Sequence, residues 1–389
     1  MIKTVIVTGT RAEYGLLKPL IEKINNSHMH ELNLLVTGMH LAPEFGETIN
    51  EIIEDGYPIT EKVEILLSSD SDIGITKSMG LALISFGEIL ERISPDLVII
   101  LGDRFEILSV ATAASVLKIP LVHIHGGETT EGAYDEAFRH SITKMSYLHF
   151  ASTNTYKNRI IQLGEHPNRV FNVGALGVEN IMRMDFLPKN EIYDLVGLEK
   201  NDKFFLVTFH PTTLEKIDVT SQIRDLLDTL VLYKKYKIVI AKANSDTNGR
   251  KINQIIDEYC DAYPNQFITF YSLGIKKYLS LMKLATLVVG NSSSGIIEAP
   301  SLKVPTINIG DRQKGRVRSD SIIDTKPYKS EIQKSIDEAL FKIKNDKFTF
   351  INKYGNGQTS DLIFNQINKN FASSVDLKKR FYDLEVFDA

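Results

Sequence analysis

The sequence predicts an α/β protein with two Rossmann-like domains, and three observations lead to this prediction. Short apolar runs bounded by Gly, Pro or Asp alternate with longer stretches of helical period, as in a parallel sheet with crossover helices. The alternation restarts after the polar segment Asp185–Lys203. The length of 389 residues also suits two domains of ordinary size. We therefore expect domains over 1–185 and 186–365, then a helical tail over 366–389 that packs back on the first domain.

The first domain is predicted from five buried strands and the helices between them. The apolar runs that predict strands are Val5–Thr8, Leu32–Val36, Leu97–Leu101, Leu121–Ile124 and Leu148–Ala151. The stretches that predict helices are Leu16–Ile24, Glu44–Glu54, Ile73–Ile93, Phe105–Leu117 and Asp135–Met145. Pro95 and Pro120 each precede a strand, where a helix has already ended. This order of elements is typical of a doubly wound sheet.

The second domain repeats the pattern. Its predicted strands are Phe204–Phe209, Lys237–Ala241, Phe267–Tyr271, Thr286–Val289 and Thr306–Ile309. Helices such as Gln222–Tyr233 and Asn248–Tyr259 lie between them. Two such domains facing one another would bind a ligand in the cleft between the carboxyl ends of their strands.

Composition excludes several classes of protein. Apolar residues make up 43% of the chain and charged residues 24%, which excludes a largely disordered protein. A net charge of −4 argues against a protein that coats nucleic acid or anionic membrane. A single cysteine, Cys260, excludes an intramolecular disulfide and a Cys-rich metal site. No signal peptide and no run of roughly 18–20 apolar residues is apparent, so we expect a cytoplasmic protein.

Two glycine-bearing turns follow predicted strands and are candidate phosphate sites. Gly9–Gly15 joins a strand to a helix N-terminus and carries Arg11, whose planar donors suit a phosphate. A plain turn with a solvated Arg11 is an equal alternative. In Gly290–Gly295, three serines between small residues let a phosphate approach the backbone, which favours binding over a simple helix cap. Glu298 follows within reach of a ribose diol.

Acidic and basic side chains gather after the predicted strands of the first domain. Asp103 and Arg104 follow one strand, where Asp103 suits acid–base chemistry. Glu128, Asp135 and Glu136 come soon after the next strand, and neighbouring carboxylates have separated pKa values that supply acid and base together. The alternative is a set of surface pairs, such as Asp135 with Arg139 one helical turn on.

Histidines raise the question of a metal. His123 and His125 share one strand face, but no third ligand stands at a recognisable spacing. We therefore expect neither a metal nor a cofactor. His210 follows the first strand of the second domain and suits either a phosphate contact or a structural role, and Asn244 follows the next strand. The basic run around Arg312 favours a phosphate clamp or a solvated loop over a nucleic-acid patch.

The ordered motifs resemble one known family. They are Thr8–Gly15, Val36–His40, Gly102–Glu106, His123–Glu128, Arg139–Lys144, Gly290–Gly295 and Ser301–Arg318. Together they are similar to the hydrolysing UDP-N-acetylglucosamine 2-epimerases of bacterial sialic-acid and capsule synthesis, the NeuC family. The resemblance spans residues 1 to about 330. It implies the glycosyltransferase-B fold and conversion of UDP-N-acetylglucosamine and water into N-acetylmannosamine and UDP, through elimination to a 2-acetamidoglucal and hydration.

The resemblance also implies roles for particular residues. Catalytic roles fall on Asp103, His125, Glu128, Asp135 and Glu136. Contacts to UDP and sugar fall on Arg11, His40, Arg104, Arg139, His210, Asn244, Ser292, Ser293, Glu298 and Arg312. His125 stands where vertebrate and several bacterial relatives have a catalytic Glu. Either His125 takes the second acid–base role or Glu128 does.

Several alternatives stay open from the sequence. A hydrolysing 2-epimerase of a diacetamido-trideoxy sugar nucleotide, of the legionaminic acid pathway, would share these motifs. A non-hydrolysing epimerase typically has Gly-Asp-Thr where this chain has Gly102-Asp103-Arg104. A glycosyltransferase need not carry the acidic cluster, and a nucleotide-sugar binding module would not require it. As partners we expect a UDP-sugar, water and further copies of the chain in a dimer or tetramer, with no nucleic acid and no membrane.

Overall fold

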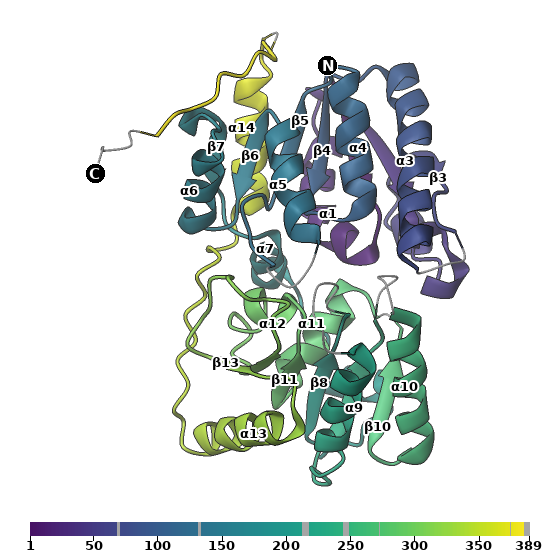
Figure 1. Ribbon diagram of the computed structural model, residues 1–389, viewed down its shortest axis with the longest axis vertical. Coiled ribbons are helices and arrows are strands. Elements are labelled where there is room, and N and C mark those ends of the chain that lie inside the picture. Colours follow the sequence, from purple (N-terminus) through teal and green to yellow (C-terminus); the bar gives the residue numbers. More distant parts are fainter. Residues whose placement is uncertain are drawn as a thin grey trace. The chain divides into compact units, whose positions relative to one another are not determined.

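The computed structural model describes residues 1–67, 71–130, 134–211, 218–243, 249–271, 273–373 and 375–384 (Figure 1). The chain divides into two compact units. Unit 1 comprises Met1–Glu128, Asp135–Asn180 and Tyr354–Ala389, and unit 2 comprises Thr129–Tyr134 and Ile181–Lys353. Each unit contains one parallel sheet covered by helices on both faces. The predicted fold class is therefore confirmed.

Unit 1 has a seven-stranded parallel sheet in the order β3-β2-β1-β4-β5-β6-β7. Its strands are β1 (Ile2–Thr8), β2 (His30–Thr37), β3 (Ile59–Val63), β4 (Leu97–Leu101), β5 (Leu121–Ile124), β6 (Leu148–Ala151) and β7 (Val170–Asn172). The central strands are buried on both faces, which explains their unbroken apolar runs. The strand order reverses between β1 and β4, and ligands of such sheets bind beyond the carboxyl ends at that reversal.

Two helical layers cover this sheet. One contains α1 (Arg11–Asn25) and α14 (Thr359–Asn370), whose apolar side chains share a core with the sheet. The other contains α3 (Asp72–Ile93), α4 (Phe105–Val116) and α5 (Asp135–Met145). The remaining elements are η1 (Gly38–Leu41), η2 (Pro43–Phe45), α2 (Ile49–Glu54), α6 (Asn154–Gln162), η3 (Pro167–Arg169) and α7 (Leu176–Arg183). The loops that carry the candidate residues follow the carboxyl ends of β1, β4 and β5.

Helix α3 is long and apolar enough to cross a membrane by length and composition alone, with a mean hydropathy of 1.4 in its most apolar window. The expectation that no such stretch exists is therefore wrong on this criterion. Phe86 and Leu90 pack into the core of unit 1, as in many core helices. Ile73 and Ile84 instead lie exposed on the opposite face.

Unit 2 has a six-stranded parallel sheet in the order β10-β9-β8-β11-β12-β13. The strands are β8 (Phe204–Thr208), β9 (Lys237–Ala241), β10 (Phe267–Phe270), β11 (Leu287–Gly290), β12 (Thr306–Ile309) and β13 (Ile322–Thr325). Helices α9 (Val219–Leu230), α10 (Gly249–Ala262) and α13 (Lys329–Lys344) cover one face. Helices α8 (Lys189–Val196), α11 (Ile275–Leu284) and α12 (Ser294–Ile297) lie on the other face of the sheet. The reversal of strand order lies between β8 and β11.

Some elements differ from the sequence prediction. The helix expected over Glu44–Glu54 is broken at Gly46 and Glu47, which both have positive φ, so η2 and α2 form instead. Strands β3, β7 and β13 were not predicted, because each is short or only partly buried.

The chain returns to unit 1 after unit 2. The amide of Ala175 donates to the carbonyl of Tyr354 at 2.7 Å, and the buried Glu179 accepts from the hydroxyl of Ser360. Helix α14 ends at Asn370, and residues 375–384 form no helix, in contrast to the helical tail expected from the sequence. Lys379 in this segment donates to both carboxylate oxygens of Glu165.

Candidate functional site

The carboxyl ends of β4 and β5 present the main cluster of polar side chains. Gly102 directly follows β4, and its positive φ of 76° turns the chain. Asp103 and Arg104 come next, before α4 begins. The Gly102 amide donates to the carbonyl of Ile124 at 3.0 Å, which ties the turn to the end of β5. Asp103 is thus held on a fixed turn at the edge of the sheet where ligands of this fold bind.

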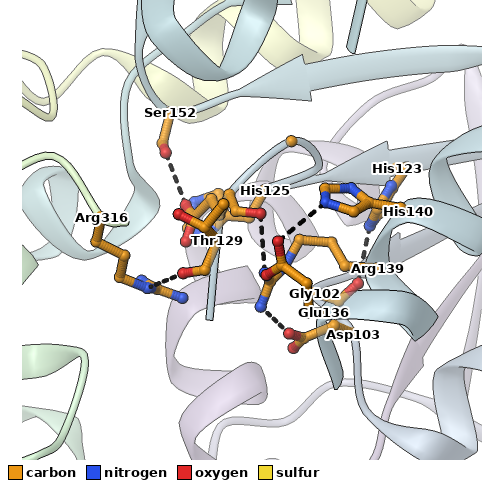
Figure 2. A network of polar contacts seen from close by, with 12 residues as sticks. Gly102, Asp103, His123, His125, Thr129, Glu136, Arg139, His140, Ser152 and Arg316 are labelled. Atoms are coloured by element: carbon orange, nitrogen blue, oxygen red, sulfur yellow. Dashed lines mark hydrogen bonds and ion pairs between the residues drawn. The ribbon is translucent and has the colours of Figure 1, made fainter. Parts of the chain in front are cut away.

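Arg139 organises this cluster. Its side chain is 2% exposed, and its guanidinium forms an ion pair with Asp103 and donates to Glu136 at 3.2 Å and to the carbonyl of Glu128 at 2.9 Å (Figure 2). One buried cation therefore connects the β4 turn, the β5 loop and helix α5. Helical spacing places Asp135 on the same face as Arg139, but it does not indicate the ion pair with Asp103 that the structure shows. Asp135 lies partly exposed at the start of α5.

His125 occupies a strained position at the end of β5. Its φ is +64°, in the left-handed region that non-glycine residues rarely adopt, and its amide donates to the carbonyl of Phe150 at 2.8 Å. Its ring nitrogen Nδ1 lies 3.8 Å from the carboxylate of Glu128, which accepts from the Ser152 hydroxyl at 2.7 Å. Strain of this kind costs about 1–3 kcal/mol and concentrates at functional sites.

His123 has a structural role. Its Nε2 donates to the carbonyl of Gly102 at 2.8 Å, and its Nδ1 accepts from the Thr143 hydroxyl at 3.1 Å. Burial lowers the pKa of His123 to about 3, so the ring is neutral. Both nitrogens are therefore engaged with the protein. No group of three potential metal-ligating side chains is found among the described residues.

The turn after β1 differs from an open anion site. Thr10 caps α1, and the carboxylate of Glu13 accepts from the amides of Gly9 and Thr10 at 2.8 and 3.2 Å. These are the donors that the sequence offered to a phosphate. Arg11 donates from Nε to Glu51 at 2.7 Å. The protein's own carboxylates thus occupy part of this donor set.

His40 is enclosed in the same region. Its Nε2 lies 3.0 Å from the Thr8 hydroxyl and its Nδ1 lies 2.9 Å from the Thr48 hydroxyl. Burial lowers its pKa to about 4, so it is neutral at physiological pH. The ring supports the loop that follows β2.

In unit 2, Asn291 links the candidate nucleotide contacts. Its side chain accepts from the amide of His210 at 2.7 Å and donates to the His210 carbonyl at 2.8 Å. Its own carbonyl accepts from Arg312 at 3.1 Å. Sequence reasoning noted Asn291 only within the serine motif. An asparagine directly after a buried strand is the sequence signal that would have indicated its role, because a buried side-chain amide needs hydrogen-bond partners.

The serine motif forms a compact hydroxyl cluster. Ser292 and Ser294 lie 3.0 Å apart between hydroxyl oxygens, and Ser294 lies 2.8 Å from the Tyr278 hydroxyl. Ser293 precedes the short helix α12, and Glu298 directly follows it as a buried residue. His210, Ser292, Ser293, Glu298 and Arg312 all follow strands of the unit 2 sheet or flank α12. Asn244 lies outside the described residues.

The two parallel sheets with helices on both faces define the glycosyltransferase-B class of fold. The solved structure of UDP-GlcNAc 2-epimerase from Neisseria meningitidis bound to UDP-GlcNAc has a TM-score of 0.79 over 95% of this chain and 100% of that chain, at 20% identity. The enzyme from Methanocaldococcus jannaschii, in complex with UDP-GlcNAc and UDP, gives 0.78 over 95% and 100%, at 22% identity. At such identities the likeness shows the fold.

Sequence comparison identifies the family. The family model described as UDP-N-acetylglucosamine 2-epimerase matches residues 22–368. The chain therefore belongs to the UDP-N-acetylglucosamine 2-epimerase family, and the prediction of an enzyme is confirmed.

Three relatives are more similar than the solved structures. The hydrolysing GDP/UDP-N,N'-diacetylbacillosamine 2-epimerase of Campylobacter jejuni is 46% identical over 89% of this chain and 88% of that protein. The polysialic acid biosynthesis protein P7 of Escherichia coli is 44% identical over 86% and 85%. The hydrolysing UDP-N,N'-diacetylbacillosamine 2-epimerase of Legionella pneumophila is 36% identical over 92% and 93%.

Proposed function

We propose that the protein is a hydrolysing 2-epimerase of a nucleotide-linked 2,4-diacetamido sugar, with UDP-N,N'-diacetylbacillosamine as its substrate. The 46% identity to the Campylobacter jejuni enzyme carries this proposal, and the Legionella pneumophila enzyme supports it. UDP-N-acetylglucosamine, the substrate that the sequence alone favoured, is the second candidate. The family description and the 44% identity to the polysialic acid protein favour it.

The geometry of unit 1 supports acid–base chemistry at C2 of the sugar. In the proposed reaction, the Asp103 carboxylate takes the C2 proton while the C1–O bond breaks and UDP leaves with the bonding electrons. The former C2–H electrons form the C1=C2 double bond. Water then adds its hydroxyl to C1 and gives up its other proton, while protonated His125 delivers a proton to the opposite face of C2. His125 is reprotonated by the proton that the water releases. The free C2-epimer and UDP are the products, and the proton on Asp103 returns to solvent.

The charges around Asp103 suit this role. The ion pair with Arg139 holds the Asp103 carboxylate in a fixed position. Glu136 shares the same guanidinium and places a second carboxylate beside it. We assign nucleotide contacts to Arg11, Arg104 and, in unit 2, His210, Ser292, Ser293, Glu298 and Arg312. Cationic and amide donors of this kind stabilise a departing diphosphate.

Proton NMR in D₂O tests the proposed reaction. The purified protein is incubated separately with UDP-N,N'-diacetylbacillosamine, its GDP analogue and UDP-N-acetylglucosamine. We expect rapid release of UDP and of a free sugar epimerised and deuterated at C2 from the first substrate. Faster turnover of UDP-N-acetylglucosamine would select the second candidate. An intact epimerised nucleotide sugar would contradict hydrolysis.

His125 and Glu128 are the two candidates for the second acid–base group, and substitution of each should lower kcat by a different factor. His125→Gln keeps a hydrogen-bonding side chain but removes proton transfer, so we expect kcat to fall about 100-fold or more. The Glu128 carboxylate already accepts from Ser152 and lies beside His125 as an orienting group. We therefore expect Glu128→Gln to lower kcat about tenfold, in the same NMR assay. The reverse order would move the acid–base role to Glu128.

We also propose a homodimer formed through helix α3. Its exposed face carries Ile73, Lys77, Ile84 and Glu91 at helical spacing. Gly80 and Gly87 lie on this face, and a Cβ at either would meet nothing within 4 Å in the chain. Glycine inside a helix costs about 1 kcal/mol relative to alanine, and the close approach of a second copy would account for that cost at these two positions.

The charges on α3 select a second copy as the occupant. Lys77 and Glu91 each lie seven residues from Ile84, on opposite sides. A two-fold axis at Ile84 therefore places Lys77 of one copy opposite Glu91 of the other, which makes the face self-complementary.

Ile84→Glu tests this surface. Ile84 is 64% exposed, so the change leaves the fold intact but buries a charge at the proposed interface. We expect the wild type to sediment as a dimer and the variant as a monomer at micromolar concentration. Ile351→Glu is the matched control, because Ile351 in unit 2 is 60% exposed. A monomeric wild type, or cosedimentation of the wild type with anionic vesicles, would contradict the proposal.

A further inference from the structure

Two buried carboxyl groups flank Gly9 at the carboxyl end of β1. Glu106, in the first turn of α4, is 1% exposed, and Glu13 of α1 is also buried. The Gly9 amide donates to Glu13, while the Cα of Gly9 faces the side chain of Glu106. Burial, followed by the charge of Glu106, raises the pKa of Glu13 to about 8.

Glu106 contacts the guanidinium of Arg104. The Nε of Arg104 donates to Oε1 of Glu106 at 2.8 Å, across two residues of the chain. Arg104 directly follows Asp103 and precedes the first residue of α4. The ion pair therefore fixes the Nε atom of Arg104, and Arg104 is adjacent in sequence to the proposed base, Asp103.

Among the described residues, Oε2 of Glu106 is buried without a hydrogen-bond partner. A buried acceptor left unpaired costs about 1–3 kcal/mol, and a buried ion pair is often no more stabilising than apolar side chains of similar volume. Packing alone would therefore favour an apolar residue at this position.

Gly9 provides the space that Glu106 occupies. A Cβ at Gly9 would lie 2.6 Å from Oε1 and 2.9 Å from Cγ of Glu106, and the three nearest atoms all belong to that side chain. Gly9 does not have a positive φ, so the backbone itself accepts alanine. An alanine at this position would displace the Glu106 carboxylate.

We propose that Glu106, seated against Gly9, is a positioning residue that holds the Arg104 guanidinium beside Asp103 for the elimination step. This inference rests on the proposed function of the site. Glu106 acts through Arg104 and does not itself touch the substrate. Its carboxylate sets the direction of a cation that stabilises the departing diphosphate, and a misplacement of about 1 Å in such a group costs up to about 100-fold in rate.

Double-mutant cycles that combine each change with Arg104→Ala, measured by kcat, test the proposal. We expect Glu106→Met and Gly9→Ala each to lower kcat about 30-fold with KM within about threefold, because the guanidinium is lost mainly in the transition state. Glu106→Gln keeps an acceptor for Arg104 and should recover kcat to within about fivefold of wild type. In the Arg104→Ala background, neither change should lower kcat further. Full additivity there would overturn the proposal.

Two measurements are independent of turnover. Glu106→Met should have a Tm equal to or above that of wild type, whereas a role in folding would lower the Tm. Labelling of Arg104 by phenylglyoxal, mapped by mass spectrometry, should accelerate at least about fivefold in Glu106→Met and in Gly9→Ala, because the guanidinium loses its carboxylate. Unchanged labelling would overturn the positioning role even if no turnover is found. Wild-type protein without turnover, with the labelling as expected, would overturn only the proposed function.

Discussion

Asp103→Asn should abolish turnover of the nucleotide sugar while leaving the protein folded. The asparagine side chain has nearly the same volume and still accepts a hydrogen bond from Arg139. It cannot take a proton from C2 of the sugar. Because general acid–base groups contribute roughly 10²–10⁴ in rate, we expect kcat to fall at least about 1000-fold. Exchange of the C2 proton with D₂O should stop together with UDP release, since both depend on the same proton transfer.

Binding separates a chemical role of Asp103 from a structural one. We expect the Kd for UDP, measured by calorimetry, to stay within about tenfold of wild type, because the assigned nucleotide contacts lie largely elsewhere. Asp361→Asn is a suitable control, since Asp361 is another acidic residue of unit 1 that pairs with a basic side chain, Lys23. The control should keep full activity. An active Asp103→Asn enzyme would contradict the assignment of Asp103 as the base.

The fold could be predicted because its central strands are buried on both faces. Leu97–Leu101 and Leu121–Ile124 were predicted to the residue, since a fully buried parallel strand gives an unbroken apolar run. The edge strand β13 has no such run, because its side chains are partly exposed. Which helix of unit 1 the returning chain packs against could not be predicted, because only tertiary packing specifies the contact between α14 and α1.

The site could be predicted in part. The reversal of strand order places the ends of β1 and β4 together, so motifs at those ends were expected near one another. The partners of each side chain depend on distances that sequence spacing does not contain. Spacing placed Asp135 and Arg139 on one helix face, but it could not indicate that Arg139 reaches Asp103 at the end of β4. The amides of the β1 turn looked open to phosphate, but Glu13 folds back onto them.

The same limit applies to buried polar residues. Glu106 lies in an apolar helix whose first turn faces the core, and the sequence alone gave it no role beyond its place in a motif. Its significance comes from Gly9, which lies almost a hundred residues earlier and leaves space for its carboxylate. A charged residue within an otherwise buried segment is therefore a useful signal for a functional contact, because such a residue needs a partner.

Arg139→Lys should lower kcat strongly, although less than Asp103→Asn does. The guanidinium reaches Asp103, Glu136 and the Glu128 carbonyl from a side chain that is 2% exposed. A lysine has one compact ammonium and cannot hold three acceptors in that planar arrangement. We therefore expect kcat to fall about 100-fold or more, since Asp103 loses its fixed position. Arg224→Lys is the control: Arg224 forms an exposed pair with Glu258, and the change should alter neither kcat nor Tm.

Arg139→Met tests whether the positive charge of Arg139 stabilises the fold. Methionine fills much of the volume but leaves Asp103 and Glu136 without their cation, and breaking a buried ion pair costs about 3–5 kcal/mol. These carboxylates are 20% and 25% exposed, so solvent reduces the loss, and we expect about 2 kcal/mol from urea unfolding. Adding Asp103→Asn should restore part of that stability, because it removes one of the two carboxylate charges that Arg139 neutralises in the wild type. If the double variant were less stable than Arg139→Met alone, the charge balance would not be the reason that this arginine lies at the centre of the cluster.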